Sequence, residues 1–497
     1  MAVTTSYPGV YIDEVSSGVR PIESAGTSTA AFIGKTVKGP VGEPTLIFKW
    51  SEYKEQFGVY DGYDAMAFAI YAFFLNGGGA AYIASVEATN YVLEKGIDGN
   101  PIQVRVPIQD EDEDGDLLYA ADGKTPVYVQ AKDEKGELLF EDDGKTPVYE
   151  YKLIYEEDGV TPVYEYKYEL SKNTYENVFE KLKNIRDISI VCLPGKAWRA
   201  TIDTTELEKK PVDQLAGDEK AKLSLAGEIA ADNGIIDLAV AHADYMKNRI
   251  VIVDIGSDVK LTNPGDVDEI VLPRNASGFS VTYYPWLKIS DPFFKSDPES
   301  KATPEIFSVA PSSFAAGMWA KIDGKRGVWK APAGVETALL GVAELTDVVD
   351  DARQGILNPL GINCIRRIPG AGPVIWGSRT LATKVEPEWR YVPVRRTACM
   401  IEESIYNNIQ WAVFEPNDHR LWSSLRVNID AFMNGLWRAG AFQGEKASDA
   451  YFVRCNLGDT MTQGDIDTGK VIVEVGFAPL KPAEFVIITI QQKVAQQ

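Results

Sequence analysis

Two apolar runs near the end of the chain have the two-residue period of β-strands. In the first run, residues 470–477, Val471, Val473, Val475 and Phe477 would share one face, and Ile472 and Glu474 would lie on the other. The second run, residues 484–490, is equally rich in β-branched and aromatic residues. Each run therefore predicts a strand that needs a cover and a neighbour.

The segment that joins these runs, Ala478–Pro482, lacks the Asn-Gly or Asp-Gly pair of a tight hairpin. Its two prolines favour an extended path. The pattern alone favours a terminal strand in the chain's own sheet. It also allows a strand that leaves the body and completes a sheet in another subunit.

Between residues 26 and 95 the pattern alternates between strands and helices. Short apolar segments predict strands at 29–34 and 81–86, and Ala65–Leu75 predicts a strongly apolar helix. Ser51 is the predicted N-cap of a shorter helix that ends at Phe57. The glycines at 77–79 follow a helix and precede a strand, which is the reverse of a phosphate-binding loop, so they indicate a helix C-cap.

Residues 171–375 alternate between helical and buried-strand patterns. This alternation predicts a largely parallel sheet covered by helices. The predicted helices are 175–185, 220–232 and 234–248, and the predicted buried strands are 188–193 and 249–254.

A long amphipathic helix is predicted from Arg420 to Gly440, with Asn417 or Asp418 as its N-cap. Its apolar stripe comprises Leu421, Trp422, Leu425, Ile429, Phe432, Met433, Leu436 and Trp437. The polar positions expected outside this stripe are Arg420, Ser424, Asn428, Asn434 and Arg438.

Residues 96–170 have a different composition. The segment DGKTPVY occurs at 122–128 and 143–149, and DGVTPVY follows at 158–164, so the repeat is irregular. Each Asp-Gly predicts a turn and each Pro-Val-Tyr predicts the start of a strand, which together indicate small tyrosine-rich hairpins. Residues 110–169 contain 19 acidic and 6 basic residues, and therefore more than half of the net charge of −22.

The acidic run Asp110–Asp116 raises the possibility of calcium binding, but it lacks the bidentate glutamate and the full loop pattern of such sites, so a solvated turn is favoured. The acidic balance argues against a nucleic-acid surface. The start of the chain has no secretory pattern, and no apolar run is long enough to span a membrane. The four cysteines are widely spaced among apolar residues and predict buried free thiols. No cofactor is expected.

Several longer segments along the chain together carry a resemblance to a known family. They are PGVY at 8–11, YYPWL at 283–287, LNPLGIN at 357–363, WGSRTL at 376–381, WRYVPVRR at 389–396, IEESI at 401–405 and EVGFAPLKPAEFV at 474–486. This set resembles contractile tail sheath proteins, which form the outer sleeve of myovirus tails and related injection systems. Ser378 replaces the usual alanine, and Pro393 stands where asparagine is common. Pro393 suggests an edge strand, and Glu402 with Glu403 suggests a salt-bridged surface.

The resemblance implies a mixed α/β (α+β) fold. It predicts a subtilisin-like α/β middle domain, a sheath core domain built from N- and C-terminal parts, and an inserted β-rich outer domain. The expected boundaries are a 1–25 N-terminal arm, the 26–95 N-terminal part of the core, the 96–170 insertion, the 171–375 middle domain, the 376–480 C-terminal core and a 481–497 C-terminal arm.

The resemblance also implies a mechanical function and no enzymatic one. Subunits would polymerise around an inner tube and contract, with baseplate and tail terminator proteins as further partners, without nucleic acid or membrane insertion. Assembly would occur in the bacterial cytoplasm, in a virion tail or tail-like particle. The expected arm residues are Tyr7, Val10, Tyr11, Ile12, Phe485, Val486, Ile487, Ile488 and Ile490. Val471, Val473 and Val475 would form the receiving sheet, and Arg420, Arg426 and Arg438 would face the tube.

A subtilisin-like hydrolase is the main alternative, because Asp254 ends a buried strand as the catalytic aspartate of that fold does. A Ser-His-Asp site requires a histidine beside it, and the chain has only His242, in a helical pattern, and His419, at a helix start. The sequence thus disfavours a hydrolase. An acidic surface adhesin would need a secretion signal.

Overall fold

The computed structural model describes residues 21–60, 62–93, 105–107, 151–153, 166–208, 210, 215–261, 272–273, 276–294, 303–382 and 387–484. The chain divides into two compact units, one formed by 1–88 with 172–497 and the other by 89–171. The second unit falls close to the expected insertion at 96–170. Its described parts include β4 (Arg105–Pro107), which pairs antiparallel with β5 (Tyr151–Leu153).

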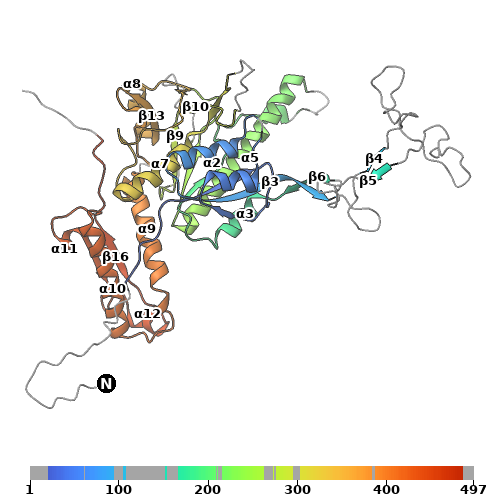
Figure 1. Cartoon of the computed structure of the whole chain (residues 1–497). Coiled ribbons are helices and arrows are strands. Elements are labelled where there is room, and N and C mark those ends of the chain that lie inside the picture. Colours follow the sequence, from blue (N-terminus) through green and yellow to red (C-terminus); the bar gives the residue numbers. More distant parts are fainter. Residues whose placement is uncertain are drawn as a thin grey trace, which may run out of the picture. The chain divides into compact units, whose positions relative to one another are not determined.

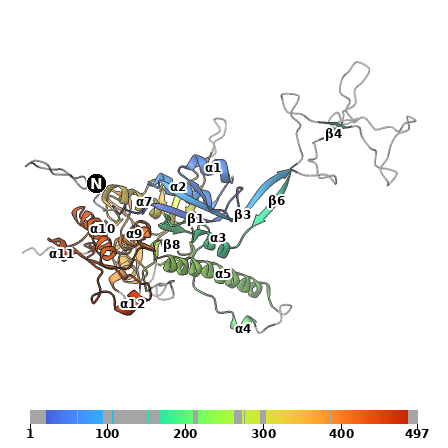
Figure 2. The same cartoon turned by 90° about the horizontal axis from the view of Figure 1, so that it is seen from below.

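A nine-stranded sheet forms the centre of the first unit (Figures 1 and 2). The order along its main path is β2, β3, β1, β7, β8, β9, β13 and β14, and β6 also pairs with β3. The strands are β1 (Thr29–Lys35), β2 (Thr45–Ile47), β3 (Ala80–Leu93), β6 (Tyr166–Lys172), β7 (Ile190–Cys192), β8 (Ile250–Asp254), β9 (Ser280–Tyr284), β13 (Ile362–Ile368) and β14 (Gly372–Ile375). The pairs from β3 through β13 are parallel, and β2 and β14 add antiparallel edges.

This order corrects the expected domain boundaries. The segments 26–95 and 171–375 were expected in different domains, yet β1 lies between β3 and β7 in one continuous sheet. The physical reason is burial: all five residues of β8 and the five central residues of β1 are buried, so these strands need neighbours on both edges and helices on both faces.

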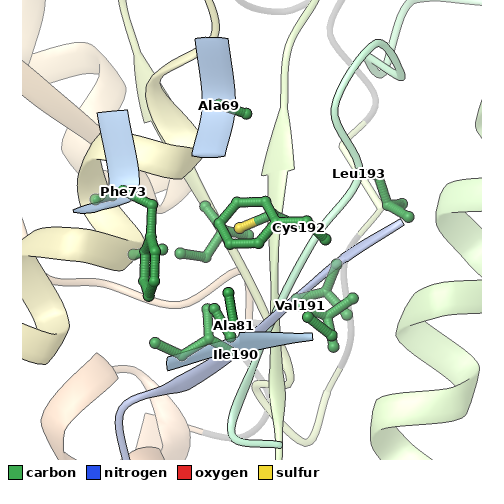
Figure 3. Packing of buried hydrophobic residues seen from close by; sticks show 14 of the residues in the cluster. Ala69, Phe73, Ala81, Ile190, Val191, Cys192 and Leu193 are labelled. Carbon is green, nitrogen blue, oxygen red and sulfur yellow. The ribbon is translucent and has the colours of Figure 1, made fainter. Parts of the chain in front are cut away.

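Helices cover the two faces of this sheet (Figure 2). On one face α2 (Ala65–Leu75) packs against α7 (Pro311–Arg326), and on the other α3 (Tyr175–Leu182) packs against α5 (Gly217–Met246). Figure 3 shows how the alternation of β7 serves both layers: Ile190 and Cys192 lie toward Phe73 of α2, whereas Val191 and Leu193 point to the opposite side. All four cysteines are buried and free, as predicted.

The remaining elements lie around this sheet or follow it. They are α1 (Trp50–Phe57), α4 (Thr205–Glu208), the three-stranded antiparallel sheet of β10 (Leu287–Ser290), β11 (Ile306–Val309) and β12 (Glu344–Leu345), α8 (Asp351–Leu357), η2 (Asn358–Leu360) and η3 (Pro387–Trp389). The C-terminal lobe, residues 392–479, contains α9 (Val392–Asn408), η4 (Gln410–Ala412), α10 (His419–Arg438), α11 (Ala447–Ala450), β15 (Tyr451–Arg454), α12 (Gln463–Asp467) and β16 (Glu474–Phe477).

Several predicted elements need correction. The two helices at 220–232 and 234–248 are one helix, α5, because the Asn233 side chain bonds to the backbone of Arg199 instead of ending the helix, and Gly234 stays helical. The helix predicted to start at Ser51 has Lys49 as its N-cap residue. Pro393, expected on an edge strand, lies in the first turn of α9, where a missing N–H costs no helical hydrogen bond.

Other predictions are confirmed. Helix α2 begins and ends where its apolar run does, and Gly77 follows it with a φ of +113°, as a C-cap glycine would. Asp418 caps α10 by accepting from the backbone N–H groups of Arg420 and Leu421. Asn428 is an exception, because it is buried, although its position was expected to lie outside the apolar stripe.

Buried charges connect α9 to the sheet. Arg396 donates two hydrogen bonds to Asp323 of α7, at 2.9 and 2.5 Å, and both side chains are less than 5% exposed. Asp323 also accepts from Thr27 Oγ1 at 2.6 Å. One helical face of α9 is thereby tied to α7 and to the segment that leads into β1.

A second group of ion pairs confirms the surface expected at Glu402 and corrects the one expected at Glu403. Glu402 is exposed and pairs with Arg395 at 2.9 Å, about two turns earlier on the same helix. Glu403 is instead buried and accepts from Arg186 at 2.9 and 2.6 Å and from Asn248 at 3.0 Å. Both residues are salt-bridged, as predicted, but Glu403 connects the lobe to the segments beside the sheet instead of facing solvent.

The first prediction concerns the buried Asp323–Arg396 ion pair. Substituting Asp323 by Asn would leave the Arg396 guanidinium buried without its counter-charge, so the free energy of unfolding should fall by about 3–5 kcal/mol. Denaturant titration measures this change. Glu336→Gln is the control, because Glu336 pairs with Arg326 and Lys330 at the rim and should cost about 1 kcal/mol or less. Equal losses of unfolding free energy in both variants would contradict the role of Asp323 as the buried counter-charge of Arg396.

Candidate functional site

A two-stranded antiparallel sheet in the C-terminal lobe is the candidate assembly site. Tyr451 of β15 pairs with Phe477 of β16, and Arg454 pairs with Glu474. Within the described part of the chain no third strand joins this sheet. Two strands alone make a marginally stable sheet, and both outer edges present backbone groups that another strand can use.

Side-chain packing fixes the register of this sheet. Phe452 lies opposite Gly476, and a β-carbon on Gly476 would lie only 2.2 Å from the Phe452 ring. The ring therefore covers the glycine directly and any larger residue at 476 would displace it. Helix α10 contacts β15, and Val453, Val475 and Phe477 are part of the apolar cluster that includes Ile429 and Met433 of α10.

The predicted receiving residues lie on this sheet or next to it. Val475 is in β16, whereas Val471 and Val473 precede the strand and do not pair within it. All three are partly buried against apolar clusters, while Ile472 and Glu474 are exposed. The alternation of faces was predicted correctly, and the strand begins four residues later than predicted.

The three arginines proposed to face a tube do not form one row. Arg420 and Arg438 are exposed in the first and last turns of α10, 18 residues apart, which is a whole number of helical turns. Arg426 is partly buried and donates to the backbone carbonyl of Cys455. The geometry thus places Arg420 and Arg438 on one face and directs Arg426 toward the chain that follows β15.

The predicted arm residues lie outside the described residues, both those between Tyr7 and Ile12 and those between Phe485 and Ile490. The structure does describe the point from which the C-terminal segment departs. There the Glu484 carboxylate binds Arg379 through both oxygens, and Tyr391 donates to it at 3.3 Å. The pKa of Arg379 is raised, chiefly by this bond.

Arg379 is itself held firmly. Its backbone N–H donates to the side chain of Asn363 at 2.7 Å, and the amide of Asn363 donates to the carbonyls of Arg379 and Thr282. Arg379 is thus attached to β9 and β13, and Glu484 attaches the departing segment to the same sheet. The sequence patterns did not predict this pair, although Arg379 lies in the segment 376–381 and Glu484 in the segment 474–486, because 105 positions separate the two residues.

The hydrolase alternative can be compared with the geometry at Asp254. The carboxylate accepts from Ser312 Oγ at 2.5 Å and from Ser312 N–H at 3.0 Å, at the N-terminus of α7. Burial raises the pKa of Asp254 to about 7, and these hydrogen bonds oppose the rise. His242 lies elsewhere, 3.1 Å from Arg249, and burial followed by that charge lowers its pKa to about 3. The structure does not bring His242 to the Ser312–Asp254 pair.

Comparison with known proteins gives a consistent result. Residues 384–493 match the family model of the phage tail sheath C-terminal domain. The chain is 25% identical to a solved structure of the anti-feeding prophage helical sheath in the contracted state. The two structures superpose with a TM-score of 0.60, and the match covers 99% of this chain and 100% of that one. The chain is thus similar to phage tail sheath proteins in the sequence of its C-terminal part, and to a contracted sheath in fold over nearly its whole length.

Curated sheath relatives match a smaller part. The chain is 34% identical over 143 residues to the tail sheath protein of Burkholderia phage BcepMu, covering 27% of this chain and 30% of the relative. It is 28% identical over 178 residues to a prophage major tail sheath protein of Pseudomonas aeruginosa, covering 35% and 43%. The chain thus spans less than half the length of the curated relatives it matches. The PVC sheath complex of an extracellular contractile injection system shares the fold, with a TM-score of 0.60.

The buried carboxylate of Asp254 leads to a prediction about pH. An ordinary aspartate titrates near 3.8, and Asp254 does so at about 7. Between these pH values the folded protein binds the proton more tightly than the unfolded chain, so rising pH removes stability. The stability of the natural protein relative to Asp254→Asn should fall from pH 4 to pH 7 by a few kcal/mol, at about 1.4 kcal/mol per unit, and then level off. Denaturant titrations across this range measure it; a constant difference would contradict it.

Ser378, which replaces the alanine usual in sheath proteins, makes a separate prediction. It is buried, and among the described residues no partner accepts or donates at its hydroxyl. Ser378→Ala should therefore raise the free energy of unfolding by about 1 kcal/mol. Thr380→Val is the control, because the Thr380 hydroxyl donates to the Trp389 carbonyl at 2.6 Å, and its loss should lower stability. A loss of stability in Ser378→Ala would contradict the claim that the Ser378 hydroxyl is buried without a hydrogen-bond partner.

Proposed function

We propose that this chain is a structural and mechanical sheath subunit. Copies of it polymerise into a helical sleeve around an inner tube, and the sleeve contracts to drive the tube through a target cell envelope. The observation that carries this proposal is the likeness in fold and sequence to a contracted helical sheath over 99% of the chain. Head-to-tail contacts between identical subunits generate helical assemblies.

The β15–β16 sheet is the proposed link between subunits. Its two edges would accept an N-terminal arm, with Tyr7, Val10, Tyr11 and Ile12, and a C-terminal arm from other copies. The C-terminal arm contributes Phe485, Val486, Ile487, Ile488 and Ile490. An added strand makes about four to six backbone hydrogen bonds, each worth roughly 1 kcal/mol net. Val471, Val473 and Val475 lie where the receiving sheet meets the core of the lobe.

Contraction requires that the folded bodies of the subunits reorient while the arm strands stay paired with the sheets of neighbouring copies. Backbone pairing in the arms depends little on the rest of the surface, so it can survive a change in the contacts between bodies. The free energy of contraction would then come from a second packing of the same bodies, in the manner of two-state interfaces.

The finer domain assignments belong to the same proposal. The parallel sheet would be the subtilisin-like middle domain, and the acidic segment 96–170 would lie at the outer surface of the sleeve. Arg420 and Arg438, which share one exposed face of α10, would face an inner tube by charge complementarity, with Arg426 as a weaker candidate. Baseplate and tail terminator proteins would bind the ends of the sleeve, and assembly would occur in the bacterial cytoplasm, in a virion tail or tail-like particle.

We do not propose an enzymatic role. Ser312 and Asp254 form a hydrogen-bonded pair that caps α7, and His242 bonds to Arg249. A serine-directed fluorophosphonate probe tests the hydrolase alternative directly, since stoichiometric labelling of Ser312 would support it.

The proposal predicts that the C-terminal arm is needed for assembly and not for folding. Negative-stain electron microscopy of the purified protein should show hollow, striated tubes. Removing residues 485–497, which leaves the Glu484 anchor in place, should abolish the tubes while circular dichroism and the melting temperature of the monomer stay unchanged.

A point variant sharpens this test. Ile488→Pro removes one backbone N–H and should disrupt pairing of an added strand, whereas Ile488→Val keeps the backbone donor and should assemble normally. Normal tubes from the truncated chain and from Ile488→Pro would contradict strand addition by this arm.

A further inference from the structure

Phe414 has an unusual position in the turn between α9 and α10. Its side chain is fully exposed, and its φ is +69°, in the left-handed region. An aromatic residue rarely adopts this conformation, because its β-carbon crowds the backbone. Val413 beside it is also exposed. The chain therefore keeps a strained backbone and an apolar ring in water without any packing in return, a combination that points to a role in contact with another molecule.

The turn is held in one conformation. The N–H of Val413 donates to the Gln410 carbonyl, and that of Glu415 donates to the Ala412 carbonyl. Asn417 then bonds to the Lys470 carbonyl at 3.0 Å and to the Trp422 indole at 2.8 Å. A rigid support lowers the entropy cost of inserting an exposed ring into a partner.

The first unit also has a groove that suits such a ring. It has a volume of about 1090 Å³ and lies where the C-terminal lobe meets α8 and the end of the sheet. Two partly exposed indoles, Trp329 and Trp376, line it. Its walls also have five cationic side chains and two carboxylates: Arg326, Lys330, Arg366, Arg379 and Lys481, with Asp351 and Glu484. We refer to it as the Trp groove.

Phe414 cannot reach the Trp groove of its own chain. Phe414 lies five residues before α10, and the groove is lined by Ala439 and Gly440, directly after α10. A helix of 20 residues separates the two by about 30 Å. Figure 1 shows α9 and α10 side by side, with the turn between them at the end of the lobe away from the central sheet.

We propose that the Phe414 turn of one copy inserts into the Trp groove of a second copy. The ring would pack on the two indoles, and the exposed carboxylate of Glu415 would pair with Lys481, which is exposed at the rim, whereas Arg326, Lys330, Arg366 and Arg379 already have carboxylate partners. A protruding residue at one end of the lobe and a pocket at the other form a head-to-tail contact that does not close on itself. The inference rests on the proposed polymer and adds a body-to-body contact to the arms.

The test uses variants of the full chain and measures the critical concentration for polymer formation by sedimentation. Phe414→Ala removes the ring and should raise this concentration about tenfold or more. Gly355→Trp fills the groove from α8, at a position where an added β-carbon meets nothing within 4 Å, and should have the same effect. The melting temperature of the monomer should not fall in either variant, because neither change removes packing.

Matched controls separate this contact from general effects on the surface. Val427→Ala removes an exposed apolar residue from α10, and Gly227→Trp adds an indole to an open position on α5; both should polymerise like the natural protein. Charge reversal tests the pairing: Glu415→Lys and Lys481→Glu should each weaken assembly, and the double variant should recover most of it.

The outcomes are distinct from those that test the proposed function. Natural protein that never polymerises would contradict the polymer and this contact together. Polymers that form equally well from Phe414→Ala and Gly355→Trp would overturn the contact alone. So would a Phe414→Ala variant that polymerises normally and loses only its binding to an inner tube protein.

Discussion

The position of the C-terminal lobe depends on charged side chains buried along α9. Arg396 with Asp323 and Glu403 with Arg186 connect this helix to α7 and to the chain before β7, and the partners lie far apart in sequence. Buried ion pairs seldom add much net stability compared with apolar packing, but an unpaired member is costly. Such pairs therefore specify one docking geometry, since a shifted lobe would leave several charges buried without partners. Under the proposed function, this selectivity would keep the lobe fixed on the sheet while the subunits move.

The C-terminal lobe has two regions that are stabilised in different ways, helix α9 beside the central sheet and the β15–β16 sheet. Next to the sheet, α9 is held by charges and by stacked groups such as the Arg395 guanidinium, 4.0 Å from the centre of the Trp389 ring. At the other side, the β15–β16 sheet packs on α10, and among the described residues no third strand covers either of its edges. The lobe thus combines a fixed attachment to the central sheet with a two-stranded sheet that can accept further strands, which is the division of roles that the proposed polymer would need.

Sequence patterns predicted the local elements well where one physical signal dominated. The apolar run of α2, the Asp418 cap of α10 and the buried cysteines required only local reasoning. The errors arose where tertiary contacts override a local signal. Two helices were predicted at 220–232 and 234–248, but the helix runs on through Asn233, whose side chain binds the backbone of Arg199. Pro393 was expected on an edge strand, although the first turn of a helix accepts proline equally well. The pairing of Arg379 with Glu484, and the burial of Glu403, depend on contacts between distant segments that no single-sequence pattern contains.

The anchor at Glu484 sets a length scale for assembly. The residues proposed to add a strand, 485–490, follow it directly, and even fully extended they reach only about 20 Å from Glu484. Under the proposed function, a sheet that receives this strand would therefore lie within about that distance of the anchor, before and after the subunits reorient. The ion pair would then act as the fixed end of a short tether, so the travel between linked subunits would depend on where the chain is fastened as well as on the strength of the strand that it adds.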